Sequence, residues 1–275
     1  MHDITDNLEL WKDEDFSGND HKPILSSTVG DHSLTSCTFI SLSADHNGGA
    51  IYYSSGHSLS IEHCIFTLCK TTKELTPLYG GGAIFINTGS SLSVISSTFI
   101  ACSTLSYGGG IFSLNTCKSS TVCLSTFIDC NACHGGGVMS LSPLFSVSSS
   151  RFLSCIASQS GGGLYYDNGQ ETCSIAFSEL VFSDDHAHYV NESDGCVNRG
   201  GGGLEDYRTS NYSSNYFCLF FTGNTAPSGV GNDISIHTVP LVFGNITRCF
   251  TTTSENSFWN TKYEGYEDWL PLDEM

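Results

Sequence analysis

Short stretches in which apolar and polar residues strictly alternate recur along this chain. Ser58-Leu59-Ser60-Ile61 and Ser91-Leu92-Ser93-Val94 are two of them. Successive side chains of a β-strand point to opposite faces, whereas an amphipathic helix needs a period of about 3.6 residues. The alternation therefore predicts an all-β protein made of many short strands, each with one buried face.

A glycine-rich signature followed by an aliphatic residue divides the chain into units. The signature begins at residues 48, 81, 108, 135, 161 and 201, so its starts are 33, 27, 27, 26 and 40 residues apart. The base period is therefore 26 or 27 residues, with insertions in two units. We expect the glycines at a corner, where a tight turn needs a positive φ or where two backbones approach closely.

A second signature, F-x-x-C, lies upstream of the glycines in the middle units, and later units replace its Cys with Asp185 and Asn224. A unit of this size cannot bury its own apolar face, so the copies must stack. Parallel stacking predicts a β-solenoid of about seven coils that lie about 4.8 Å apart. The expected inward columns are Ile51, Ile84, Ile111, Val138, Leu164 and Leu204, and Phe39, Phe66, Phe99, Phe127, Phe152, Phe182 and Phe221.

The cysteines of the repeat form a column of their own. The chain has 13 cysteines, and Cys69, Cys102, Cys130 and Cys155 occupy equivalent positions in neighbouring units, as do Cys37 and Cys64. Coils about 4.8 Å apart satisfy the Cα separation of a disulfide. This spacing permits disulfides but does not require them, and the favoured interpretation is buried free thiols that act as small apolar residues.

One stretch, Cys130-Asn131-Ala132-Cys133-His134, also matches the C-x-x-C-H attachment pattern of a c-type haem. Its first cysteine is a repeat position that three other units share. We therefore expect neither haem nor zinc there, and no cofactor or metal elsewhere.

The joint recurrence of G-G-[AG]-[ILV] and F-x-x-[CN]-x-A, from about Ser33 to Ile236, resembles the repeats of bacterial polymorphic outer membrane proteins. The resemblance is closest to the cysteine-rich versions of that repeat in surface proteins of anaerobic protists. It implies a right-handed parallel β-helix of the pectin-lyase-like kind and a role in surface display or adhesion. It implies no known catalytic site.

Charge divides the chain into three parts. The formal net charge is −18, and the acidic residues gather near both ends. We expect an acidic cap over residues 1–28, the β-helix over 29–240 and an acidic, aromatic-containing cap over 241–275. Such a surface repels nucleic acid, and no apolar run is long enough to span a membrane.

The expected location is the cell surface or the extracellular space. The first residues are acidic and show no signal-peptide pattern. Three sequons, at Asn191, Asn211 and Asn245, are candidate glycosylation sites.

An outward column next to the inward aliphatic stack is the expected contact site. Alternation places Tyr52, Phe85, Phe112, Met139 and Tyr165 on that column. Exposed apolar strips often mark contact sites, here for glycans or for proteins of host or neighbouring cells. A shifted register, or a tail that covers the strip, would remove this site.

A carbohydrate-active enzyme, a polysaccharide lyase or hydrolase, is the alternative on the same fold. Its best candidates are Asp167 and Glu205, which alternation places about 8 Å apart on neighbouring coils. A second cluster is Asp184-Asp185 with His186 and His188. Turn and surface acids are the favoured interpretation of both sets, and the scarcity of basic residues along the coils argues against a cleft for polyuronates, so we expect no catalysis.

Overall fold

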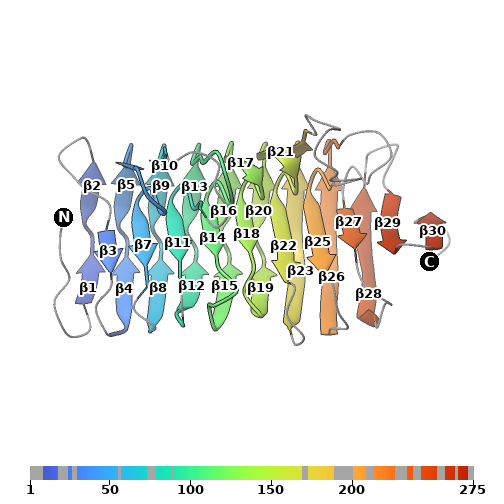
Figure 1. Cartoon of the computed structure of the whole chain (residues 1–275), viewed down its shortest axis with the longest axis horizontal. Helices are drawn as coiled ribbons and strands as arrows, with labels where there is room; N and C mark the ends of the chain where they lie inside the picture. Colours follow the sequence, from blue (N-terminus) through green and yellow to red (C-terminus); the bar gives the residue numbers. More distant parts are fainter. Residues whose placement is uncertain are drawn as a thin grey trace.

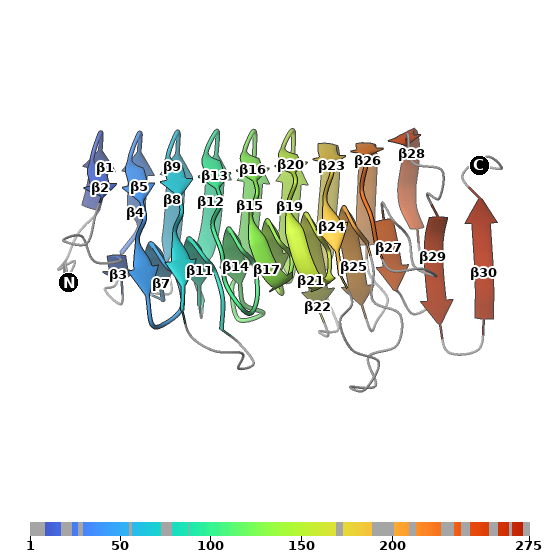
Figure 2. The ribbon, with the colours of Figure 1, turned by 90° about the horizontal axis from the view of Figure 1, so that it is seen from above.

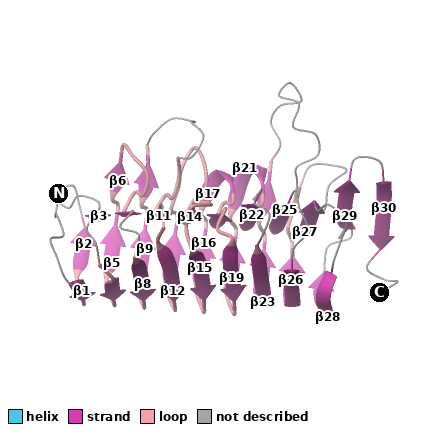
Figure 3. Ribbon diagram, turned by 60° about the horizontal axis from the view of Figure 1, so that its bottom comes forward, coloured by secondary structure: helices cyan, strands magenta, loops and turns pink. Residues whose placement is uncertain are grey.

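The chain folds into long sheets of parallel strands. The computed structural model describes residues 9–17, 24–26, 30–54, 57–72, 79–87, 89–168, 173–188, 201–208, 213–226, 234–237, 243–252, 258–263 and 266–271. Strands of successive repeats lie side by side along the long axis of the molecule (Figure 1). Strands and loops, and no helix, make up the described residues (Figure 3). This all-β architecture agrees with the alternation of the sequence and is consistent with a parallel β-helix.

One pass of the chain through the sheets, which we call a rung, begins in the longest sheet. That sheet bends at a corner, so it has a first and a second arm. The first arm contains β1 (Glu9–Lys12), β4 (His32–Thr35), β8 (Ser58–Glu62), β12 (Ser91–Ile95), β15 (Ser119–Cys123) and β19 (Leu144–Ser148). The second arm contains β2 (Asp15–Ser17), β5 (Thr38–Ile40), β9 (Ile65–Thr67), β13 (Thr98–Ile100), β16 (Thr126–Ile128) and β20 (Arg151–Leu153). Three longer strands, β23 (Ser174–Ser183), β26 (Ser213–Thr222) and β28 (Phe243–Thr252), join this sheet at its C-terminal end.

A short row of strands follows the second arm, and the second sheet completes the rung (Figure 2). The short row comprises β6 (Ser43–Ala44), β10 (Lys70–Thr71), β17 (Asn131–His134), β21 (Ile156–Ser160) and β24 (His186–Ala187). The second sheet comprises β3 (Ile24–Ser26), β7 (Ile51–Tyr53), β11 (Ile84–Ile86), β14 (Ile111–Ser113), β18 (Val138–Ser140), β22 (Leu164–Asn168), β25 (Leu204–Arg208), β27 (Ile234–His237), β29 (Phe258–Tyr263) and β30 (Tyr266–Pro271).

The sheets extend beyond the boundaries expected at residues 28 and 241. The strands β1, β2 and β3 pair in parallel with β4, β5 and β7, and Phe16 stacks on Phe39. At the other end β28 and β29 continue the parallel pairing, and only β30 pairs antiparallel. The regular pairing therefore includes parts of both acidic ends, while their capping role stays a prediction.

The two predicted inward columns are confirmed. Along the phenylalanine column, neighbouring rings from Phe16 to Phe221 lie 4.6–5.0 Å apart between centroids, with interplanar angles of 2–8°. The aliphatic column from Ile51 to Leu204 pairs residue for residue along the second sheet and is buried throughout. The 26-to-27-residue period therefore sets the register of the stack.

Glycine is required at the corner for the two reasons that the sequence suggested, a positive φ and a close approach of two backbones. The first glycine of each signature has a positive φ, for example 64° at Gly108. The second packs on the next rung so closely that a Cβ at Gly109 would overlap the carbonyl oxygen of Gly136. Only glycine satisfies both demands at this corner.

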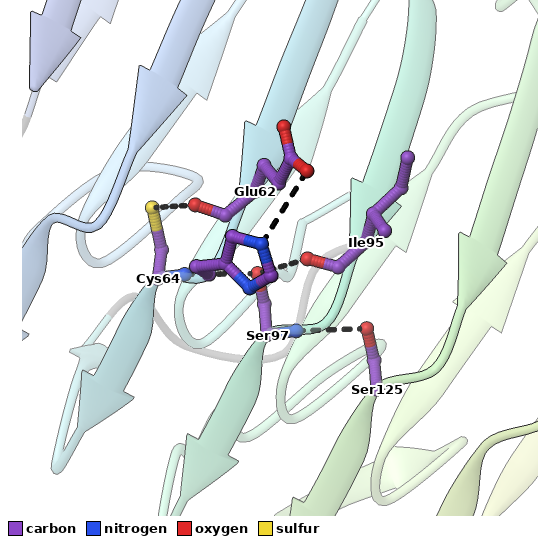
Figure 4. A network of polar contacts seen from close by, with 6 residues as sticks. Glu62, Cys64, Ile95, Ser97 and Ser125 are labelled. Carbon is purple, nitrogen blue, oxygen red and sulfur yellow. Dashed lines mark hydrogen bonds and ion pairs between the residues drawn. The ribbon is translucent and has the colours of Figure 1, made fainter.

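A ladder of hydrogen bonds crosses the corner between the two arms (Figure 4). The Cys64 N–H donates to the Ser97 hydroxyl at 3.1 Å, and the Ser97 N–H donates to the Ser125 hydroxyl at 3.2 Å. Each hydroxyl also donates to a carbonyl two residues upstream, as Ser97 does to Ile95 at 2.9 Å. Cys37 and Ser150 occupy the same column. The ladder thereby pairs buried backbone groups that the bend takes away from the sheet.

Ser125→Ala tests this ladder. The change leaves the buried Ser97 N–H and the Cys123 carbonyl without the Ser125 hydroxyl. We expect a loss of about 1–3 kcal/mol in the free energy of unfolding, measured by urea denaturation. Ser93→Ala, on the half-exposed outward face of β12, is the control and should change stability little. Equal midpoints for both variants would contradict the role of the ladder.

Candidate functional site

The predicted contact strip forms one column of the second sheet, but it is not exposed. Tyr52, Phe85, Phe112, Met139 and Tyr165 pair with one another in the expected order. Phe85, Phe112, Met139 and Tyr165 are all buried, and only Tyr52 is half-buried. The column therefore lies where alternation predicts, but the expectation that it is exposed is wrong.

The cause is the chain segment that precedes each glycine corner. The positive φ at the first glycine turns the chain sharply before it enters the second sheet. The residue just before the glycine then lies over the outward column. The Tyr107 ring centre is 5.3 Å from that of Phe112, and the His134 ring centre is 5.0 Å from that of Tyr165. These aromatic rings form a second layer that covers the strip.

The two candidate carboxylates have the expected offset but different environments. Tyr165 pairs with Glu205, and Asp167 pairs with Tyr207, so the carboxylates differ by one rung and two residues. Glu205 is fully buried, whereas Asp167 is half-buried. An inverting pair must reach both the sugar and a water molecule. The burial of Glu205 gives the enzyme alternative no support.

The acid and histidine cluster is also divided between the interior and the surface. Asp184 and His188 are exposed, and His186 shares a hydrogen bond of 2.7 Å with the Thr225 hydroxyl. Asp185 is buried on the cysteine column, where Oδ1 accepts the Cys155 N–H at 2.7 Å. The Asp185 N–H in turn donates to the Asn224 side chain at 2.9 Å. The predicted continuation of the column through Asp185 and Asn224 is thus confirmed.

The structure describes the side chain of none of the three glycosylation candidates. Asn191 and Asn211 lie outside the described residues, and Asn245 lies in β28, where only the backbone is described. No helix in the described part of the chain has the length and hydropathy to cross a membrane. Nor do the described residues contain a cluster of three or more His, Cys, Asp or Glu that would suit a metal ion.

A partly exposed apolar face does exist, on the second arm of the long sheet. Figure 2 shows the strands β5, β9, β13, β16 and β20 of this arm side by side. Strands β5, β9, β13, β16 and β20 direct their phenylalanines inward, so both neighbours of each phenylalanine face outward. We call these outward positions the second-arm face. They are Thr38, Ile40, Ile65, Thr67, Thr98, Ile100, Thr126, Ile128, Arg151 and Leu153, followed on β23 by Val181 and Ser183.

This face is poor in charge and rich in aliphatic side chains. Arg151 is its one charged residue among those twelve positions, although the chain has a net charge of −18. Six large apolar side chains are well exposed among the described residues, and Ile65, Leu68, Leu124 and Phe220 lie on this arm or at its two corners. The exposed fractions of these four are 43%, 53%, 57% and 40%. The second-arm face is therefore the candidate functional site.

Sequence reasoning overlooked this face although a signal was present. Thr-Phe-Ile occurs at Thr38–Ile40, Thr98–Ile100 and Thr126–Ile128. Because the phenylalanine points inward, the flanking threonine and isoleucine must point outward. An outward isoleucine repeated on several rungs is the feature that separates this arm from the serine-rich first arm.

Comparison with known protein families, with curated proteins and with solved structures finds no match to this chain. The candidate site therefore depends on the residues and geometry given above.

Asp185→Asn tests the buried carboxyl. Burial, and then the Cys155 thiol, raise the pKa of Asp185 well above its ordinary value, and Oδ2 finds no hydrogen-bond partner among the described residues. Below the unfolded-state pKa of about 3.9 both states are protonated. As the pH rises above it only the unfolded state ionises, so stability falls until the folded-state pKa is reached.

We therefore expect Asp185→Asn to raise the free energy of unfolding at pH 7 by about 1–3 kcal/mol and to lose this advantage near pH 4. Urea denaturation between pH 4 and pH 8 measures the difference. The exposed Asp184→Asn makes the same charge change and should show no such trend. A gain independent of pH would refute the assignment.

Proposed function

We propose that this chain is a non-catalytic scaffold, displayed at a cell surface or secreted, that binds a protein of a neighbouring cell through the second-arm face. The observation that carries this proposal is that four exposed large apolar side chains lie on or beside the second-arm face, which holds one charged residue, Arg151, in a strongly acidic protein. Monomeric proteins rarely expose contiguous apolar patches of more than about a few hundred Å², and patches above that size mark interaction sites.

A protein partner fits this face better than a glycan does. Sugar-binding surfaces use rows of aromatic rings for stacking, whereas the second-arm face consists mainly of aliphatic and threonine side chains, and Phe220 is the one exposed ring on its continuation in β26 among the described residues. Methyl groups of isoleucine, leucine and threonine suit an apolar protein patch, where buried area supplies the affinity. The scarcity of charge there also avoids the desolvation of ions at the centre of an interface.

The handedness of the fold and the repeat family to which the chain is related are part of the same proposal. The repeat signatures favour a right-handed parallel β-helix of the pectin-lyase-like kind, related to the polymorphic outer membrane protein repeats. Right-handed crossovers between parallel strands of one sheet are the strong rule in proteins, which supports the same hand. Adhesion, glycosylation and an extracellular location come with that resemblance.

Ile100→Glu with Ile128→Glu tests the proposal. Both side chains are half-exposed on adjacent strands, so the double variant should fold normally and place two charges in the contact face. We expect saturable binding of the fluorescently labelled wild-type chain to intact cells of the kind that produces it. Binding by the double variant should fall at least about tenfold, because each charge must be desolvated in the contact.

The matched control is Ile95→Glu, an equally half-exposed isoleucine on the first arm. Treatment of the cells with protease should abolish binding, and periodate oxidation of their glycans should leave it intact. Absent cell binding, or undiminished binding by the double variant, would refute the proposed function. Loss after periodate alone would replace the protein partner with a glycan.

A further inference from the structure

Cysteines stand next to cysteines on adjacent rungs at both corners of the second arm. Cys37 and Cys64 are neighbours at the first corner, where the Cys37 N–H lies 3.4 Å from the Cys64 sulfur. Cys69, Cys102, Cys130 and Cys155 are neighbours at the second corner, and all of these side chains are 0–1% exposed. Six of the ten cysteines whose side chains are described therefore belong to runs along the stack.

Hydrogen bonding does not explain cysteine at the first corner. Ser97, Ser125 and Ser150 occupy the same position on the following rungs and make shorter bonds of 3.1–3.2 Å to the backbone. Serine oxygen is also the better acceptor and donor. Further along the same column Leu180 and Leu219 replace serine, whereas cysteine replaces it on two adjacent rungs, so the two thiols are direct neighbours.

Hydrogen bonding does not account for cysteine at the second corner either. The thiols of Cys69, Cys102, Cys130 and Cys155 lie 3.6–3.8 Å from the carbonyl oxygens around them. Asp185 and Asn224 make bonds of 2.7 and 2.9 Å from the same column. The Cys102 thiol interacts with the thiols of both Cys69 and Cys130. Rungs about 4.8 Å apart lie within the Cα separation that a disulfide requires.

We propose that these two columns are sites of disulfide bonds between adjacent rungs, and that they pair Cys37 with Cys64, Cys69 with Cys102, and Cys130 with Cys155. This is the only pairing of neighbours that uses all four cysteines of the second corner. The bonds would tie successive rungs covalently along two edges of the second arm. This inference is independent of the proposed binding function.

Each bond forms by exchange with a small-molecule disulfide such as oxidised glutathione. One cysteine thiolate attacks the oxidant and releases one glutathione thiolate, which leaves a mixed disulfide. The neighbouring cysteine thiolate then attacks the protein sulfur and releases the second glutathione. Two protein thiols are oxidised, one glutathione disulfide is reduced to two thiols, and the two protons pass from cysteine to glutathione.

The reaction belongs to folding rather than to the finished stack. Burial raises the pKa of the Cys102, Cys130 and Cys155 thiols well above the ordinary value. The reactive species is the thiolate, so buried thiols of a folded, reduced chain exchange slowly. Cys123 and Cys173, which are half-buried, should react with a thiol reagent before the columns do.

The test is a disulfide map of the full chain. The chain is refolded either with a mixture of oxidised and reduced glutathione or with a phosphine reductant, then alkylated in denaturant, digested and analysed by mass spectrometry. We expect the three named pairs only after refolding with glutathione, and a thermal midpoint about 5–10 °C higher than that of the reduced chain.

Two variants make the pairing specific. Cys102→Ser should leave Cys69 as a free thiol and retain the pair of Cys130 with Cys155. Cys117→Ser, a buried cysteine outside both columns, should retain all three pairs. Alkylation of all six column cysteines after refolding with glutathione would overturn the proposal, as would a predominant pair of Cys102 with Cys130. The map of the wild-type chain decides the matter even if a variant fails to fold.

Discussion

In-register parallel pairing of successive rungs is the constraint on which the whole structure depends. When each residue pairs with the residue at the same position of the next unit, every side chain meets its own equivalent about 4.8 Å away. Each position must therefore carry a side chain that packs against copies of itself. Phenylalanine does so by stacking its ring, isoleucine by aliphatic contact, glycine by close backbone approach, and serine by accepting the N–H of the preceding rung.

The same constraint decides where function can reside. The interior is a set of filled columns, and the outward side of the second sheet is covered by Tyr107 and His134. Among the described residues, the outward faces of the long sheet and the corners offer exposed positions for contacts. On the second arm the outward residues are mainly aliphatic residues and threonines, with Arg151 as the one charged residue of the second-arm face. At its two corners the stacked thiols suit covalent ties between rungs.

The repeat period was enough to predict the inward columns, because alternation and stacking are local rules that the whole chain obeys. The prediction that the aromatic strip is exposed was wrong, because alternation indicates which side of a strand a residue occupies but not which other chain segment covers that side. Tyr107 and His134, aromatic residues just before the positive-φ glycines, were the sign of that cover. The earlier start of the stack was also visible, since Phe16-Ser17-Gly18-Asn19 matches F-x-x-N. Asp185 could be placed on its column from the sequence, but its burial and its raised pKa depend on the rungs on either side.

The central claim is that equivalent positions of successive units lie one rung apart, and spin-label distances test it most directly. Ser33, Thr121, Ser146 and Ala176 occupy one outward column of the first arm, on β4, β15, β19 and β23. With one label at Ser33, double electron–electron resonance should give mean separations of about 14, 19 and 24 Å to the other three, in equal steps of one rung. Separations that do not increase in equal steps, or distributions spread over tens of ångströms, would contradict the stacked register.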